Sequence, residues 1–161
     1  LDWSSTGPLV LSALDVGSFF GVMPLLELLG VDAEAIAENL VAVINQRLVR
    51  RICPHCATPR VASDDERRWL DPASADETLR VFYGRGCHHC RDTGYLGRLP
   101  VYELLAVNRD LADAIASDAS RAEMRQRAQT VGMRPILALA RHRVLEGETT
   151  MEEILRTGGE D

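Results

Sequence analysis

The feature that most constrains this chain is the placement of its cysteines. The sequence contains four, and they form two C-x-x-C pairs, Cys53 with Cys56 and Cys87 with Cys90, on either side of residues 57–86. A C-x-x-C turn brings two thiolates to one ion, and Zn²⁺ favours four such ligands in a tetrahedron at about 2.3 Å. We therefore predict a structural zinc site with these four cysteines as its ligands.

Four thiolates also suit other chemistries. An iron site of the rubredoxin type would use the same ligands. Disulfides would require an oxidising compartment, which nothing else in the sequence indicates, and a redox C-x-x-C normally lies in a βαβ context that neither pair has. His55, His88 and His89 lie within the two pairs and are alternative ligands. We interpret them as exposed turn residues, because four thiolates already complete a closed structural site.

Length and composition predict a chain that folds around an aliphatic core. Of its 161 residues 46% are hydrophobic and 5% aromatic. A chain of this length can bury about 70% of its extended surface, so the zinc is expected to stabilise a local lobe rather than the whole protein. There is no apolar run of about 18 residues and no signal-peptide pattern at Leu1 to Ser4. We therefore expect no membrane span, and a cytoplasmic location for the reduced thiols.

The charge balance excludes one class of partner. The net charge is −6, and every basic residue is an arginine. An acidic chain without interleaved basic and aromatic residues is a poor match for a phosphate backbone. A zinc ribbon that binds nucleic acid therefore remains an alternative that the composition disfavours.

The apolar pattern predicts an α/β fold. Residues 9–14 form a continuous apolar run, which predicts a strand buried on both faces with Asp15 at its carboxyl end. Helices are predicted over residues 18–29, after Ser18, and from Asp32 to about Asn45, and a strand over residues 47–52. An apolar strand without neighbours would expose an edge, so we expect the chain to self-associate.

Local signals predict the remaining elements. Capping boxes at Ser63, Ser120 and Thr150 mark three helix starts, and Pro135 marks another. Further predictions are a helix over 110–117, a strand over 80–84, and a strand over 99–106 with Pro100 among its first residues or at a sheet edge.

Several motifs around the cysteines carry a family resemblance. They read Gln-Arg-Leu-Val-Arg at residues 46–50, Thr-Gly-Tyr-Leu-Gly-Arg at 93–98, Val-Tyr-Glu-Leu-Leu at 101–105, and Gly-Glu-Thr-Thr-Met-Glu-Glu-Ile-Leu-Arg at 147–156. Together with the two C-x-x-C pairs, they resemble the C-terminal part of the traffic ATPases that drive type II secretion and type IV pilus assembly. The resemblance covers nearly the whole chain.

The resemblance implies a RecA-like α/β core with an inserted zinc lobe and a helical C-terminal lobe. Residues 1–52 would form part of the core, 53–90 the two-knuckle insert, 91–107 the return to the core, and 108–161 the helical lobe. Members of this family are cytoplasmic hexamers that use ATP and Mg²⁺ at the inner membrane. Homo-oligomers and platform proteins of a secretion or pilus system are therefore the implied partners.

Two departures from the family pattern bear on catalysis. The chain has no Gly-x-x-x-x-Gly-Lys-Ser/Thr stretch and no lysine to hold phosphates, so the Walker motifs are expected upstream of Leu1. Pro8 and Asp15 stand where the family has histidines, and a carboxylate at the second position would oppose a triphosphate. We assign no catalytic or nucleotide-binding residue.

The arginines leave one alternative open. The chain might complete in trans an ATP site held by another chain, with Arg47, Arg50 and Arg98 near phosphate. The competing interpretation is that these arginines form surface or structural ion pairs, as most arginines on solvated faces do.

Overall fold

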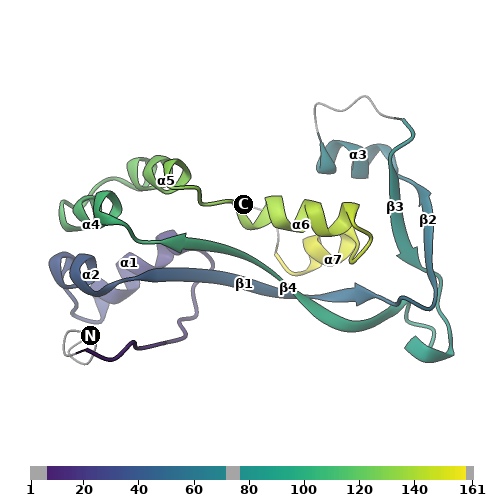
Figure 1. Ribbon diagram of the computed structural model, residues 1–161, viewed down its shortest axis with the longest axis horizontal. Helices are drawn as coiled ribbons and strands as arrows, with labels where there is room; N and C mark the ends of the chain where they lie inside the picture. Colours follow the sequence, from purple (N-terminus) through teal and green to yellow (C-terminus); the bar gives the residue numbers. More distant parts are fainter. Residues whose placement is uncertain (1–6, 72–76, 159–161) are drawn as a thin grey trace. The chain divides into compact units, whose positions relative to one another are not determined.

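The computed structural model describes residues 7–71 and 77–158 and is a mixed α/β structure (Figure 1). By contacts the chain divides into two compact units. Unit 1 comprises residues 1–45 and 103–134, and unit 2 comprises residues 46–102 and 135–161. These units combine chain segments differently from the four consecutive ranges expected from the sequence.

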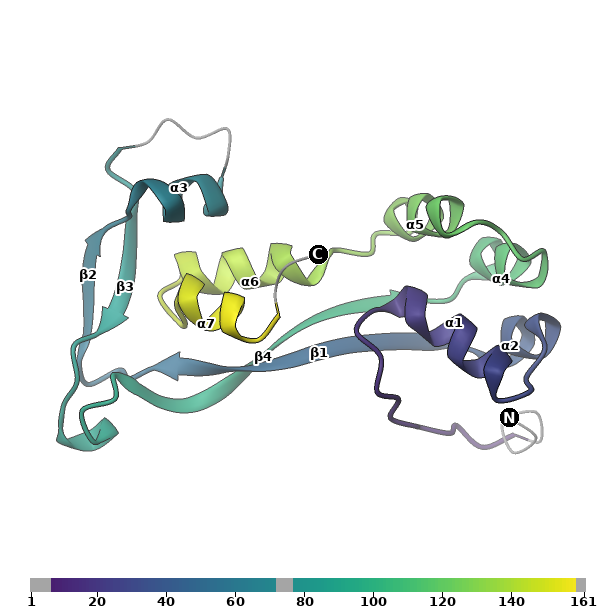
Figure 2. The same cartoon turned by 180° about the vertical axis from the view of Figure 1, so that it is seen from behind.

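Two long strands contribute residues to both units. They are β1 (Ala42–Ile52) and β4 (Tyr95–Ala106), which pair in a two-stranded sheet and run in opposite directions (Figures 1 and 2). Pro100 therefore lies inside β4 rather than among its first residues. The strand tolerates this proline because β4 pairs on one side only, which leaves an edge without ladder hydrogen bonds.

Unit 1 is built from four helices that pack on the end of this sheet. The helices are α1 (Phe19–Leu28), α2 (Ala33–Asn39), α4 (Arg109–Ala116) and α5 (Arg121–Thr130). Three of them begin as predicted, because the side chains of Asp32, Asn108 and Ser120 each accept a hydrogen bond from a backbone N–H of the first turn. The core of the unit contains Phe19, Ile36, Leu105, Leu111, Ala114, Ile115, Met124 and Ala128.

Two predictions for the first third of the chain are wrong. Residues 9–14 lie in neither a helix nor a strand, and Leu9 and Leu11 are 74% and 89% exposed. A strand buried on both faces needs a neighbour on each side, and neither sheet of the described residues includes this segment. Asp15 therefore does not follow a strand, and self-association cannot rest on the edge of one.

The second predicted helix is also too long. It ends at Asn39 instead of Asn45, and Val43 and Ile44 belong to β1. The β-branched residues Val41, Val43 and Ile44 favour the extended backbone, and this preference outweighs the helical spacing that predicted a common face.

Unit 2 combines a hairpin-like sheet with three helices. Strand β2 (Ala57–Val61) pairs antiparallel with β3 (Arg80–Gly84), so that Ala57 faces Gly84. The helices are α3 (Asp64–Leu70), α6 (Ile136–Leu145) and α7 (Met151–Arg156). The core of this unit contains Val49, Ala62, Leu70, Val81, Leu99, Val101, Ala140, Val144 and Ile154.

The helix predicted from Ser63 is confirmed, including its capping box with Glu66. Glu66 also forms two hydrogen bonds with the Arg60 guanidinium, at 2.6 and 2.7 Å, which attach α3 to β2. The proline predicted to stop this helix, Pro72, and residues 159–161 of the expected frayed end lie outside the described residues.

Candidate metal centre

The four cysteines lie together in unit 2. Their sulfur atoms are all within 4.8 Å of one another. The Sγ–Sγ distances are 3.9 Å for Cys53–Cys87, 3.9 Å for Cys56–Cys90 and 3.7 Å for Cys87–Cys90. A tetrahedron with metal–sulfur bonds of about 2.3 Å has edges of about 3.8 Å. The sulfurs therefore fit one tetrahedral ion, and all four thiols are free rather than joined in disulfides.

Two tight turns position the ligands. The first follows β1 and is closed by a hydrogen bond from Cys56 N to Cys53 O at 3.2 Å. The second is a short 3₁₀ helix, His88–Cys90, in which Cys87 N donates to Cys90 Sγ at 3.2 Å. Arg91 then reverses the chain in the left-handed conformation, with φ of 52°. Each turn thus directs two sulfurs to the same point.

The Thr-Gly-Tyr motif supports both turns from behind. The Thr93 hydroxyl donates to Cys90 O at 2.6 Å, and Cys53 N donates to Gly94 O at 2.9 Å. Gly94 has φ of +77°, and a Cβ built on Gly84 would lie 1.9 Å from Gly94 O. The two backbones can approach this closely only because neither residue has a side chain.

Replacing Gly84 with alanine should therefore destabilise unit 2 by about 2–4 kcal/mol, because one of two backbone segments must move. The matched control is Gly17→Ala, since a Cβ there would meet nothing within 4 Å. Urea unfolding of both variants measures the difference. Equal stabilities for the two would show that the backbones separate at little cost.

Burial sets the protonation of the thiols. Burial raises the pKa of the Cys56 thiol to about 12 and also raises the pKa of Cys53. Burial acts in the same direction on Cys90, but backbone N–H groups of Cys87 and Gly94 outweigh it and lower the pKa of this thiol to about 7. Buried thiolates need a cation to offset their charge, and a divalent metal supplies it.

The three histidines do not join the cysteine cluster. His55, His88 and His89 are exposed. The ring of His89 lies 3.9 Å from that of His55 and 3.8 Å from that of His88, centroid to centroid. Within residues 7–71 and 77–158, the group of side chains that can hold a metal ion consists of the four cysteines. The sequence-based interpretation of the histidines as exposed turn residues matches this arrangement.

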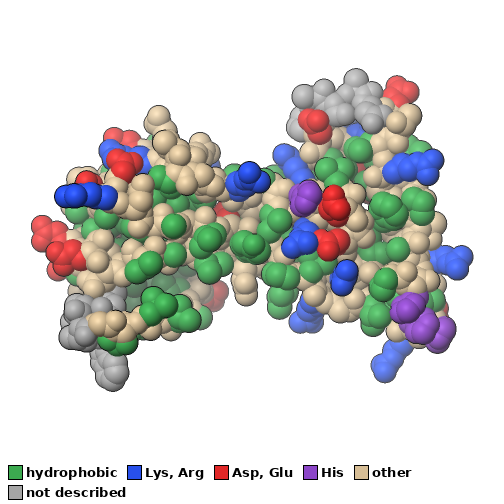
Figure 3. Space-filling model, in the orientation of Figure 1, with side chains coloured by type: hydrophobic (Ala, Val, Ile, Leu, Met, Phe, Trp, Pro, Cys, Tyr) green, Lys and Arg blue, Asp and Glu red, His purple; other side chains and the backbone are tan. Residues whose placement is uncertain are grey.

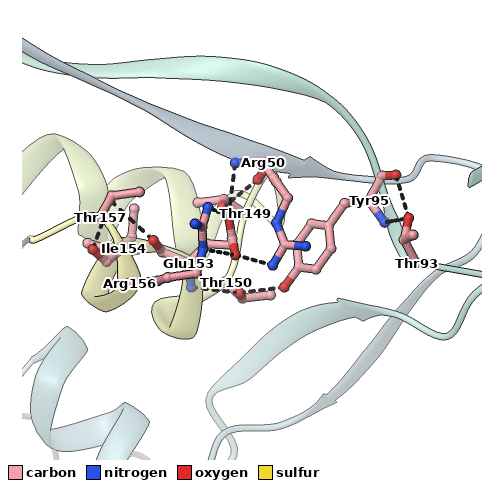
Figure 4. Close-up of polar contacts among 9 residues, drawn as sticks. All are labelled: Arg50, Thr93, Tyr95, Thr149, Thr150, Glu153, Ile154, Arg156 and Thr157. Atoms are coloured by element: carbon pink, nitrogen blue, oxygen red, sulfur yellow. Dashed lines mark hydrogen bonds and ion pairs between the residues drawn. The ribbon is translucent and has the colours of Figure 1, made fainter.

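A second polar cluster, centred on Glu153, lies in unit 2 (Figure 4). The Glu153 carboxylate is fully buried and forms an ion pair with the Arg50 guanidinium. It also accepts from Arg50 N at 3.2 Å and from Arg156 Nε and Nη2 at 2.9 and 3.0 Å. The Arg50 guanidinium lowers the pKa of this carboxyl to about 2.

The same cluster connects α7 to β1 and β4. Arg50 lies over the Tyr95 ring, with Cζ 4.2 Å from the centroid, and Tyr95 Oη is 2.9 Å from Thr150 Oγ1. The Thr149 hydroxyl donates to Arg50 O at 2.8 Å (Figure 4). The sequence predicted a capping box from Thr150 to Glu153, and only half of it forms. Thr150 accepts from Glu153 N, while the carboxylate binds the two arginines instead.

The three arginines singled out in the sequence are not all at one place. Arg50 and Arg98 line one open depression of about 490 Å³ together with Leu48, Arg156 and Thr157, and Arg47 does not line it. The sequence did not single out Arg156. Its position at the end of the Thr-Thr-Met-Glu-Glu-Ile-Leu-Arg motif was the available signal.

These observations define a mixed α/β protein with a closed four-cysteine site. Comparison with known proteins places it further. Residues 1–156 match the family described as type II/IV secretion system protein, and the chain belongs to this family. Within the described residues, no helix has both the length and the apolar character needed to cross a membrane.

The similar proteins are motor ATPases by name. The chain is 38% identical over 98% of its length to the type II secretion system protein E of Pseudomonas aeruginosa. It is 36% identical over 94% to the type IV pilus assembly ATPase TfpB of Acinetobacter baylyi, and 34% identical over 93% to PilB of Thermus thermophilus. It spans 31%, 26% and 17% of the length of these relatives, respectively.

Proposed function

We propose that this chain is the metal-binding C-terminal segment of an ATPase for type II secretion or type IV pilus assembly. Family membership supports the assignment to a secretion or pilus ATPase. The tetrahedral spacing of the cysteine sulfurs carries the metal-binding part. We assign Cys53, Cys56, Cys87 and Cys90 as the ligands of one structural Zn²⁺.

The proposed role of the site is structural. Four thiolates leave no open coordination position for water or substrate, and three of the four cysteines are buried. Bound zinc would supply the positive charge that keeps the thiolates ionised and would crosslink the two turns. Iron could occupy the same ligands, but zinc suits a closed site without redox work.

The wider context follows from the family. We propose that the full protein contains a RecA-like core, assembles as a homo-oligomer of six subunits and binds ATP and Mg²⁺ through parts outside this sequence. We further propose that it lies at the cytoplasmic face of the inner membrane, and that this segment contacts neighbouring subunits or a platform protein there. The helical region after residue 108 is proposed to be a C-terminal lobe.

Native mass spectrometry of the chain, with and without a chelator and with added ATP and Mg²⁺, tests the proposal. We expect one zinc per chain, its loss to the chelator, and no bound nucleotide. A chain without metal would overturn the zinc assignment. ATP bound only in the presence of a partner chain would favour the alternative in which this segment completes an active site in trans.

A further inference from the structure

We propose that the depression lined by Leu48, Arg50, Arg98, Arg156 and Thr157, here termed the arginine depression, is a docking site for a carboxylate-rich segment of a partner protein. It rests on unit 2 alone, since all five residues belong to that unit. It deepens the interaction role proposed above by naming a surface and the chemistry of its partner.

The arginine depression has an excess of positive charge. Three guanidinium groups line it, and one buried carboxylate, Glu153, binds two of them, those of Arg50 and Arg156. Glu152 acts on Arg50 at longer range through its charge. Arg98 is exposed and forms no ion pair or hydrogen bond with the part of the chain that the structure describes. This local excess contrasts with the net charge of −6 for the chain.

The two paired arginines are held in place, which makes the site preorganised. Arg50 is fixed by Glu153 on one side and the Tyr95 ring on another, and Arg156 binds Glu153 through two parallel hydrogen bonds (Figure 4). An incoming carboxylate can therefore bind Arg98 through both oxygens without reorganising the arginines beside it. Leu48, which is 52% exposed, offers an apolar contact at the same place.

The surroundings favour a carboxylate over a phosphate group. Phosphate sites are usually built from backbone N–H groups at a glycine-rich loop or a helix N-terminus. Here the helix α7 contributes Arg156 from its last turn and is followed by Thr157, so its carbonyl end borders the depression. Side-chain forks alone supply the donors, as in arginine–carboxylate pairs between proteins.

Fluorescence anisotropy with labelled hexaglutamate, at low ionic strength, tests the inference on the zinc-loaded chain. Hexaglutamate should bind despite the acidic net charge, and neutral hexaglutamine should not. Arg98→Ala should weaken hexaglutamate binding about fivefold, which corresponds to the loss of one good exposed ion pair. The matched control is Arg80→Ala on β3, because Arg80 is exposed and does not line the depression. It should change binding less than about twofold.

Three results would overturn the inference. The first is no binding of hexaglutamate to the unchanged chain. The second is equal weakening by the two variants, which would attribute binding to the overall field. The third is binding of pyrophosphate that depends on Arg98 without binding of hexaglutamate, which would make the depression a phosphate site. Zinc content is measured in every sample, so failure of the docking inference and failure of the metal assignment are told apart.

Discussion

Replacing Cys90 with serine should lower the zinc affinity of the chain by at least about 100-fold. Loss of a residue that only supports a metal ligand typically costs about 10–100-fold, and loss of a ligand should cost more. Cys90 is buried, and its sulfur lies 3.7 Å from that of Cys87 and 3.9 Å from that of Cys56, so no other side chain of the described residues can take its place. Competition with a chromogenic chelator measures the affinity.

The same variant should lose stability in unit 2. When zinc is present at about 100–1,000 times its dissociation constant, binding stabilises the folded state by about 3–4 kcal/mol, and the variant forgoes this contribution. Hydrogen exchange should show lost protection in β2, β3 and both cysteine turns. Unit 1 should keep its protection, because its core contains none of the residues around the site.

His55→Ala is the control for the metal assignment. It lies between two ligands but is exposed, so the variant should bind zinc as the unchanged chain does. If His55→Ala loses the metal while Cys90→Ser keeps it, the ligand set contains a histidine and the assignment of four cysteines is wrong.

The sequence predicted best where a local interaction decides the structure. The caps at Asp32, Ser63, Asn108 and Ser120 form as predicted, because a side-chain oxygen and a nearby backbone N–H need no distant partner. The convergence of the cysteines also followed from spacing, since each C-x-x-C turn positions two sulfurs by itself.

The predictions failed where distant segments decide. Residues 9–14 have the composition of a buried strand, but a strand exists only when another strand pairs with it. Val43 and Ile44 fit a helical stripe, yet pairing with β4 keeps them extended. The role of Glu153 could not be predicted either, because Arg50 reaches it from a position 103 residues away in the sequence.

Replacing Glu153 with glutamine should destabilise the chain by about 2–3 kcal/mol at pH 7. Breaking a buried ion pair costs about 3–5 kcal/mol, and we place this case lower because Arg50 and Arg156 are 43% and 56% exposed and regain water. The matched control is Glu152→Gln, which removes the same charge from the adjacent, exposed position. It should change the free energy of unfolding by less than about 0.5 kcal/mol.

The effect of Glu153→Gln should vanish in acid. The pKa of Glu153 is about 2 in the folded chain, against about 4.3 for an unperturbed glutamate. Because the folded value is the lower one, the contribution of the carboxylate is fully present above pH 4.3 and is lost as the pH falls towards 2. The difference in pKa corresponds to about 3 kcal/mol, similar to the cost expected at pH 7.

Urea unfolding of the unchanged chain and of Glu153→Gln between pH 7 and pH 2 measures this dependence. Thiol protonation releases metal from both proteins in acid, so the difference between them isolates the carboxylate. We expect a gap of about 2–3 kcal/mol that closes below pH 4. A gap that persists at pH 2 would instead mean that glutamine fits poorly in the buried position. The stabilisation would then come from packing around α7 rather than from the charge that Glu153 shares with Arg50 and Arg156.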